Sequence, residues 1–113
     1  MLRLDGKVAI VTGAARGQGV ATARLLARQG ARVILTDLLD EEGEAAARDI
    51  GAEALFRQHD VSREDHWQAI VEEVIVKFDR LDILVNNAAI SAGRTPIMDL
   101  RRDQFARVLD VNL

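Results

Sequence analysis

The stretch TGAARGQG, residues 12–19, directly follows the apolar run VAIV, residues 8–11, and opens a segment rich in alanine and leucine. A buried strand that ends in a glycine turn and leads into a helix is the setting of a phosphate-binding loop. Gly13 allows a tight turn, Gly17 allows a pyrophosphate to approach the backbone, and Gly19 allows close helix packing. The N–H groups and dipole at the helix start favour an anion. We therefore predict a dinucleotide site; a glycine turn without a ligand is the alternative.

An acidic residue ends the next apolar run. Asp37 follows RVILT, residues 32–36, at about the distance from the glycines where a carboxylate can accept hydrogen bonds from the ribose hydroxyls of an adenosine. The same carboxylate would repel the 2′-phosphate of NADP. We therefore expect NAD as the cofactor in preference to NADP.

The composition indicates a globular chain of one domain or part of one. The 113 residues are 49% hydrophobic, carry a net charge of −3 and include no cysteine, which excludes disulfides and cysteine zinc sites. The basic residues are scattered, so we expect no nucleic-acid partner. The first residues resemble neither a signal peptide nor a membrane span. We expect a cytoplasmic protein without a metal site.

Apolar runs alternate with helical patterns along the chain. This alternation predicts an α/β fold, a doubly wound parallel sheet with helices on both faces. Together with the motifs it indicates a Rossmann-like dinucleotide fold, whose strand order is 3-2-1-4 in this half. Asp40 is expected to cap the second helix, which Gly43 weakens, and Ser62 with Asp65 resembles a capping box. The predicted strands cover residues 8–11, 32–36, 54–58 and 83–85, and the predicted helices cover residues 18–29, 40–50, 62–78 and a segment after Asp99.

Four motifs in order resemble the N-terminal half of the short-chain dehydrogenase/reductase family, over essentially the whole chain. The family's Thr-Gly-x-x-x-Gly-x-Gly motif matches residues 12–19, and Asp60-Val61 matches its adenine-contacting pair. The segment 87–89 matches its Asn-Ala-Gly, with alanine in place of glycine at the end. Other spacings resemble bacterial hydroxysteroid dehydrogenases. The resemblance implies NAD(H) contacts at Gly13, Arg16, Gly17, Gln18, Gly19, Asp37, Leu38, Asp60, Val61, Asn87, Ala88 and Ala89.

Arg16 is the feature that argues against NAD. Some NADP-using members of the family place a basic residue just before the second glycine of the motif. We interpret Arg16 instead as a solvated arginine that touches the pyrophosphate or Asp37.

The resemblance implies hydride transfer between NAD and an alcohol or ketone, which in this family depends on a tyrosine and a lysine four residues later. The sequence contains no tyrosine. Asn112 matches the family's helix asparagine, a member of its proton relay, and is our one catalytic candidate; a frayed terminal asparagine is the alternative. His59 and His66 are interpreted as surface histidines. We therefore expect an NAD-binding half that is not catalytic alone.

Two other functions are alternatives to an NAD-binding half of an oxidoreductase. A non-catalytic half-domain that self-associates is the first alternative, and a methyltransferase with an adenosyl cofactor fits the motifs less well. The fourth strand would be an apolar edge, and a last helix would expose Phe105, Val108 and Leu109. Such surfaces favour pairing with another chain, so we expect a homo-oligomer, as a homodimer.

Overall fold

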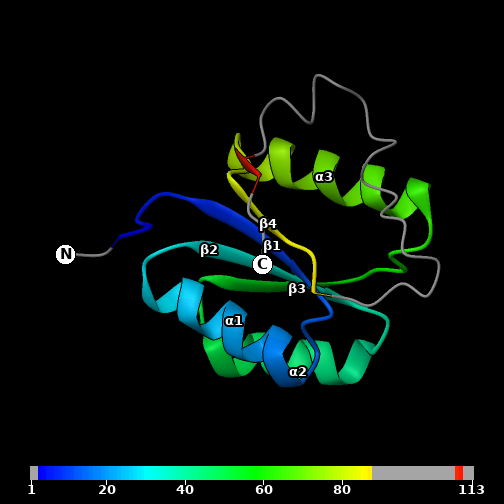
Figure 1. Cartoon of the computed structure of the whole chain (residues 1–113), viewed down its shortest axis with the longest axis horizontal. Coiled ribbons are helices and arrows are strands. Elements are labelled where there is room, and N and C mark those ends of the chain that lie inside the picture. The colour runs from blue at the N-terminus through cyan, green and yellow to red at the C-terminus, as the bar shows by residue number, and fades with distance from the viewer. Residues whose placement is uncertain (1–2, 88–108, 111–113) are drawn as a thin grey trace.

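The computed structural model, which describes residues 3–87 and 109–110, has a parallel sheet between two layers of helices (Figure 1). The predicted α/β fold and the strand order 3-2-1-4 are confirmed, and a fifth strand extends the sheet to the order β3-β2-β1-β4-β5. The strands are β1 (Val8–Thr12), β2 (Arg32–Asp37), β3 (Ala54–Gln58), β4 (Ile83–Val85) and β5 (Leu109–Asp110), and the helices are α1 (Gly17–Arg28), α2 (Asp40–Ile50) and α3 (Glu64–Phe78).

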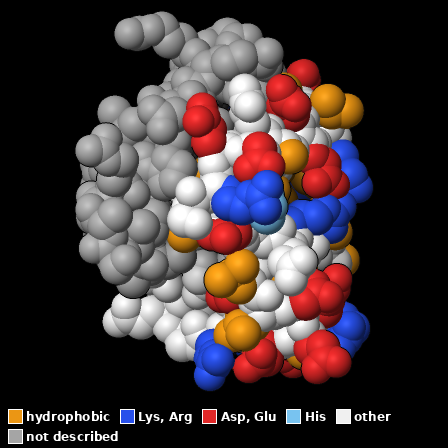
Figure 2. Space-filling view, turned by 90° about the vertical axis from the view of Figure 1, so that its right-hand side faces the viewer, with side chains coloured by type: hydrophobic (Ala, Val, Ile, Leu, Met, Phe, Trp, Pro, Cys, Tyr) orange, Lys and Arg blue, Asp and Glu red, His pale blue; other side chains and the backbone are white. Residues whose placement is uncertain are grey.

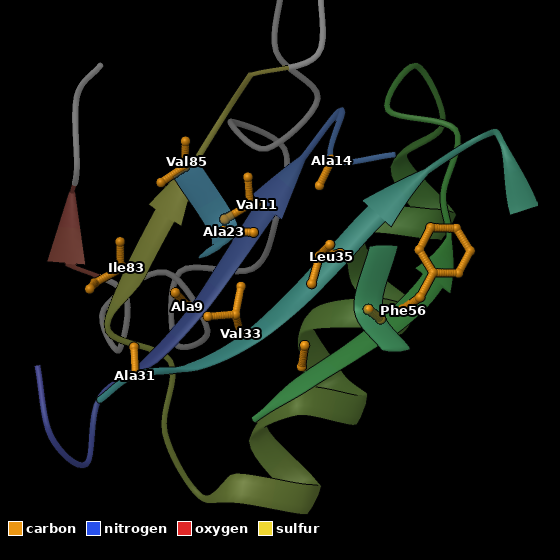
Figure 3. Packing of buried hydrophobic residues seen from close by; sticks show 12 residues of the cluster. Ala9, Val11, Ala14, Ala23, Ala31, Val33, Leu35, Phe56, Ile83 and Val85 are labelled. Atoms are coloured by element: carbon orange, nitrogen blue, oxygen red, sulfur yellow. The ribbon is translucent and has the colours of Figure 1, made fainter. Parts of the chain in front are cut away.

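The central strand β1 is buried on both faces, which is why its sequence is continuously apolar. Its residues alternate between two cores. Ala9 and Val11 face α1 and α2 in one cluster (Figure 3), whereas Val8 and Ile10 face α3 in the other. The helices lie on both sides of the sheet accordingly (Figure 1). Because all the strands are parallel, their carboxyl ends lie at one edge of the sheet.

Helix α2 packs on the sheet through a glycine. A Cβ atom added to Gly43 would lie against the ring of Phe56, within 2.5 Å of its Cζ atom. The glycine that the sequence predicts only to weaken this helix is therefore required by packing. The predicted cap is wrong, because Asp40 is the first helical residue and Leu39 takes the N-cap position without a side-chain hydrogen bond.

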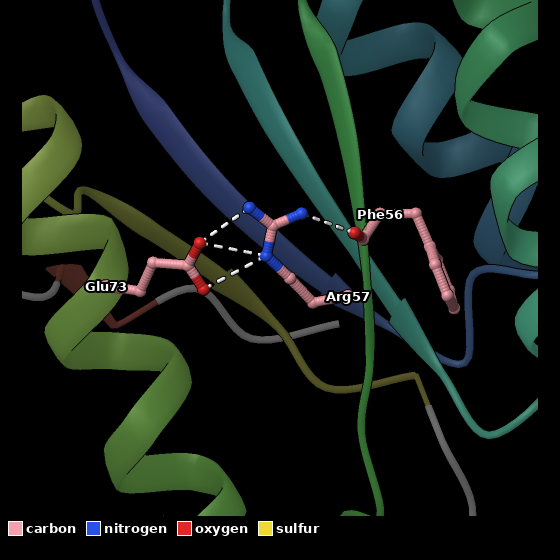
Figure 4. Close-up of polar contacts among 3 residues, drawn as sticks. All are labelled: Phe56, Arg57 and Glu73. Atoms are coloured by element: carbon pink, nitrogen blue, oxygen red, sulfur yellow. Dashed lines mark hydrogen bonds and ion pairs between the residues drawn. The ribbon is translucent and has the colours of Figure 1, made fainter.

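An ion pair joins the edge strand β3 to α3 (Figure 4). The Arg57 guanidinium donates from Nη2 to Glu73 Oε2 at 2.6 Å and from Nε to both carboxylate oxygens, and its Nη1 donates to the Phe56 carbonyl. These bonds hold the pKa of Glu73 below its usual value. Both side chains are 35% exposed, so solvent screening limits the pair to about 1 kcal/mol or less.

The predicted capping box before α3 is wrong. The helix begins at Glu64 after the N-cap residue Arg63, without a side-chain cap. Ser62 instead donates from N at 3.0 Å and from Oγ at 2.6 Å to Asp60 Oδ1. Serine competes between turns and helix caps, and here the turn formed by Asp60 uses its hydroxyl.

Part of the predicted last helix is a strand. Leu109 lies in β5 and pairs in parallel with Ile83, and Asp110 pairs with Leu84. The prediction that β4 is an exposed edge is therefore wrong, because a segment of the same chain supplies main-chain partners for it. This removes the basis for pairing of copies through β4. Phe105 and Val108 lie outside the described residues.

Among the described helices, none combines the length and the apolar character that crossing a membrane requires.

Candidate functional site

The loop between β1 and α1 depends on three glycines. Gly13 has φ 62° and Gly17 has φ 64°, both in the left-handed region that glycine adopts without strain. A Cβ atom on Gly17 would meet nothing within 4 Å, so the space beside it is open. A Cβ atom on Gly19 would collide with the Gly13 carbonyl and lie 2.8 Å from Ala14 Cα. The start of α1 is thus packed directly on the turn.

The N-terminus of α1 is uncapped. Its N-cap residue, Arg16, makes no side-chain cap hydrogen bond, and the first turn contains no acidic residue. The first N–H groups of a helix have no acceptor within it, and a helix N-terminus attracts anions. The open side of Gly17 lies at this end, with Gln18 next along the helix. These residues fit a phosphate group.

Asp37 lies beside this loop at the end of β2. Its Oδ2 atom accepts from the Ala15 N–H at 3.0 Å, and its Oδ1 atom accepts from the Leu39 N–H at 3.0 Å. The carboxylate therefore joins the glycine loop to the turn that leads into α2. Leu38, next to it, is 59% exposed, which leaves this apolar side chain available for contact.

Arg16 forms an ion pair with a residue of α2. Its Nε atom lies 3.7 Å from Glu42 Oε2 in α2, and both side chains are largely exposed. The structure thus pairs Arg16 with Glu42 and not, as one part of our interpretation had it, with Asp37.

The segment after β3 lies next to the end of β2, where the His59 N–H donates to the Asp37 carbonyl at 2.9 Å. The Asp60 N–H donates to His66 Nδ1 at 3.0 Å, and the Val61 carbonyl accepts from Trp67 Nε1 at 2.9 Å. The hydrogen bonds from the side chain and backbone of Ser62 lower the pKa of Asp60. Asp37 and Asp60-Val61, far apart in sequence, are thereby brought to one edge of the sheet.

His59 is buried, with 1% of its surface exposed, so our interpretation of it as a surface histidine is wrong. Its Nδ1 lies 2.9 Å from Thr36 Oγ1, and its ring stands edge to face against Trp67 with centroids 4.4 Å apart. Burial, with a smaller effect of His66, lowers the pKa of His59 to about 4. His59 is therefore neutral near pH 7 and belongs to the support beneath the Asp60-Val61 segment.

Thr12 connects the first and fourth strands, a role that the sequence analysis missed. Its Oγ1 accepts from the Asn87 N–H at 2.9 Å and lies 3.2 Å from Asn86 Oδ1 and 3.4 Å from the Val85 carbonyl. Asn87 Nδ2 donates to the Gly13 carbonyl at 3.4 Å. The signal in the sequence was a threonine placed last in an apolar run, where its hydroxyl is buried and needs a partner.

Most of the candidate residues thus meet at the carboxyl edge of the sheet, where a doubly wound fold binds ligands. Figure 2 shows this face, on which acidic, basic and uncharged side chains are intermixed. Within residues 3–87 and 109–110, no group of three or more His, Cys, Asp or Glu side chains is arranged to hold a metal ion. The candidates Ala88, Ala89 and Asn112 lie outside the described residues.

Comparison with known proteins identifies the fold's family, since a family model described as short chain dehydrogenase matches residues 7–113. The chain belongs to the short-chain dehydrogenase family. The resemblance seen in its motifs is confirmed. Members of this family bind a nicotinamide dinucleotide, NAD or NADP.

Relatives of this short-chain dehydrogenase chain include two curated enzymes. The 3-alpha-(or 20-beta)-hydroxysteroid dehydrogenase of Mycobacterium tuberculosis is 42% identical over 111 residues, covering 98% of this chain and 42% of that protein. The cyclopentanol dehydrogenase of Comamonas testosteroni is 40% identical over 116 residues, covering 100% of this chain and 46% of that protein. The chain therefore spans less than half the length of these relatives.

A solved structure matches the fold. The hydroxysteroid dehydrogenase from Escherichia coli superimposes with a TM-score of 0.69 at 35% sequence identity, over 74% of this chain and 36% of that one. This similarity supports the sheet order described above.

Proposed function

We propose that residues 1–113 form the N-terminal, dinucleotide-binding half of a cytoplasmic NAD-dependent oxidoreductase acting on an alcohol or ketone. The observation that carries this proposal is the loop before α1, where Gly17 is open on one side, the helix start is uncapped and the Asp37 carboxylate lies alongside. The bound nicotinamide would supply the hydride acceptor or donor. The residues of this chain would hold and orient the dinucleotide.

Each part of the dinucleotide has a candidate partner. The pyrophosphate would take the free N–H groups at the start of α1, beside Gly17 and Gln18. The adenosine would lie between the end of β2 and the segment after β3, where Leu38 offers exposed apolar surface. The ribose next to the nicotinamide would lie by the end of β4, where Asn87 is fixed by Thr12. The remaining proposed contacts are Gly13, Arg16, Gly19, Asp60, Val61, Ala88 and Ala89.

The preference for NAD over NADP is proposed from charge. Each carboxylate oxygen of Asp37 accepts one main-chain hydrogen bond, and a carboxylate has about four acceptor sites. Capacity therefore remains for the ribose hydroxyls, whereas a 2′-phosphate would meet a like charge. Arg16, the cation that could offset this repulsion, is paired with Glu42.

The substrate class is proposed from the relatives, whose names include a cyclic alcohol and hydroxysteroids. A secondary alcohol on a ring is the chemistry they share. Asn112 is proposed as a member of the proton relay. The 113 residues include no tyrosine, so we propose that they supply the nucleotide site and not the general acid.

Calorimetric titration of the chain with NAD and with NADP tests the proposal. The wild type should bind NAD more tightly than NADP. Asp37→Ala should weaken NAD binding about 10- to 100-fold, because hydrogen bonds to a charged group contribute about 1.5–3 kcal/mol, and should leave NADP binding unchanged or improved. Asp40→Ala removes a neighbouring carboxylate at the start of α2 and serves as the matched control.

The ratio of the two affinities is the diagnostic quantity. Because Asp37 also holds the Ala15 and Leu39 N–H groups, a collapsed loop would weaken both cofactors equally and leave the ratio unchanged. An unchanged ratio would remove Asp37 from the ribose site. A folded wild type that binds neither dinucleotide would refute the proposed function.

A further inference from the structure

Three consecutive residues after β3 are each held through a main-chain group. The His59 N–H donates to β2, and the next two residues are held by side chains of α3. His66 Nδ1 accepts from the Asp60 N–H at 3.0 Å, and Trp67 Nε1 donates to the Val61 carbonyl at 2.9 Å. Two adjacent residues of one helix thus fix two adjacent residues of the segment.

The two helical side chains differ in what else they do. Trp67 is fully buried and belongs to the core between the sheet and α3, so its packing alone explains its presence. His66 is only partly buried and is not a member of either core cluster. Its described hydrogen bond is the one to the Asp60 N–H. Holding the Asp60 N–H in place is therefore the structural role of the His66 ring.

We propose that His66 is a positioning residue for the adenosine end of the dinucleotide, acting by accepting the Asp60 N–H and so holding the Asp60-Val61 segment in its binding geometry. The inference rests on the proposed function, which assigns the adenosine to this segment. With the Asp60 N–H held by the ring, the Asp60 carboxylate accepts the two hydrogen bonds of its turn with Ser62 through Oδ1, and within the described residues these bonds leave Oδ2 unused. The Oδ2 atom is then the acceptor for the adenine amino group.

The contact depends on the protonation of the ring. An acceptor nitrogen carries no hydrogen, so Nδ1 must be bare and the neutral ring must carry its hydrogen on Nε2. A protonated ring has N–H groups on both sides, and two donors would then face each other across this contact. The neutral ring with a bare Nδ1 atom is therefore the form that holds the Asp60 N–H.

Two substitutions test the acceptor. His66→Asn keeps an acceptor oxygen close to the place of Nδ1, whereas His66→Leu removes the acceptor. NAD is the probe, and its affinity is measured by calorimetry. The protection of the Asp60 amide against hydrogen exchange is measured without ligand.

We expect His66→Leu to bind NAD about three- to tenfold more weakly than the wild type, the effect of one net hydrogen bond. His66→Asn should bind NAD like the wild type. The Asp60 amide should be protected in the wild type and in His66→Asn and exchange faster in His66→Leu.

Wild-type affinity in His66→Leu, or unchanged protection of its Asp60 amide, would overturn the positioning role while leaving the proposed function intact. NAD binding by His66→Asn as weak as that by His66→Leu would also overturn it. If the wild type binds no NAD, the proposed function fails and the role of His66 in binding fails with it. The exchange data, which need no ligand, distinguish this result from failure of the His66 contact alone.

Discussion

Two glycines at opposite ends of β1 allow the phosphate site to be tested against a matched control. Gly6, before the strand, has φ 83°, and Gly17, after it, has φ 64°; a Cβ atom at either would meet nothing within 4 Å. Alanine at each position therefore creates backbone strain without a collision. A left-handed conformation costs an L-residue roughly 1–2 kcal/mol. Gly6→Ala and Gly17→Ala should thus lose similar stability.

The two variants should differ in binding. Beside Gly17, the added methyl group would fill the space in which a phosphate approaches the first N–H groups of α1. Losing one hydrogen bond from an N–H group to a charged phosphate costs about 1.5–3 kcal/mol, which corresponds to at least a tenfold loss of affinity. Gly6 lies outside the loop, so its variant should bind NAD like the wild type.

Both quantities can be measured on the same samples. Thermal unfolding can be followed by the fluorescence of Trp67, the chain's one tryptophan, which is fully buried. Each kcal/mol lost should lower the melting temperature by about 4–8 °C. NAD affinity is measured by calorimetry. Wild-type affinity in Gly17→Ala would refute the assignment of the phosphate to this loop, and an equal loss in Gly6→Ala would show that strain alone reduces binding.

Three further predictions concern stability. Gly43→Ala should cost about 1–3 kcal/mol of stability through its collision with the Phe56 ring. Adding Phe56→Leu should recover most of the lost stability in urea unfolding. No recovery would contradict the collision. The pKa of His59 is lowered to about 4 from 6.5, so the unfolded chain binds more protons than the folded chain between these pH values. Lowering the pH from 6.5 to 4 should therefore reduce the free energy of unfolding by up to about 1.4 kcal/mol per pH unit. The pH-dependent unfolding of His59→Leu should lack this component, and an unchanged slope in that variant would reject the reasoning. Asp82→Ala should cost about 1–3 kcal/mol, because it leaves the buried Val8 N–H without its acceptor. Truncation of Arg80, the exposed ion-pair partner of Asp82, should cost less than about 1 kcal/mol. Equal losses of stability in thermal unfolding would show that the ion pair dominates.

The sheet and the glycine loop could be predicted because their signals are local. A continuous apolar run such as residues 8–11 reports a strand covered on both faces, and a left-handed turn such as that at Gly17 requires glycine whatever surrounds it. The family motifs added the order of the strands. Neither inference needed knowledge of a contact between distant residues.

The features that the sequence did not reveal depend on distant contacts. His59 is buried because Trp67 of α3 covers it and Thr36 of β2 provides a polar partner, and neither neighbour can be read from the residues around it. Glycine is likewise required at position 43 by a distant residue, because the Phe56 ring fills the space that a Cβ atom would need. Ser62 is the exception, because its two options, a helix cap and a turn, are both local, and in the structure it forms the turn with Asp60, two residues earlier.

The hydrogen bonds of Thr12 have a consequence for the order of folding. This residue ends the strand that feeds the glycine loop, yet its partners Val85, Asn86 and Asn87 lie 73 to 75 positions later in the chain. Such distant pairings form late, because a long stretch of chain must be ordered first. On the ribosome, the glycine loop would emerge well before the residues that fix its base. Binding of the dinucleotide would then report a late event, the docking of β4 on β1, and not the earlier formation of the loop's own helix.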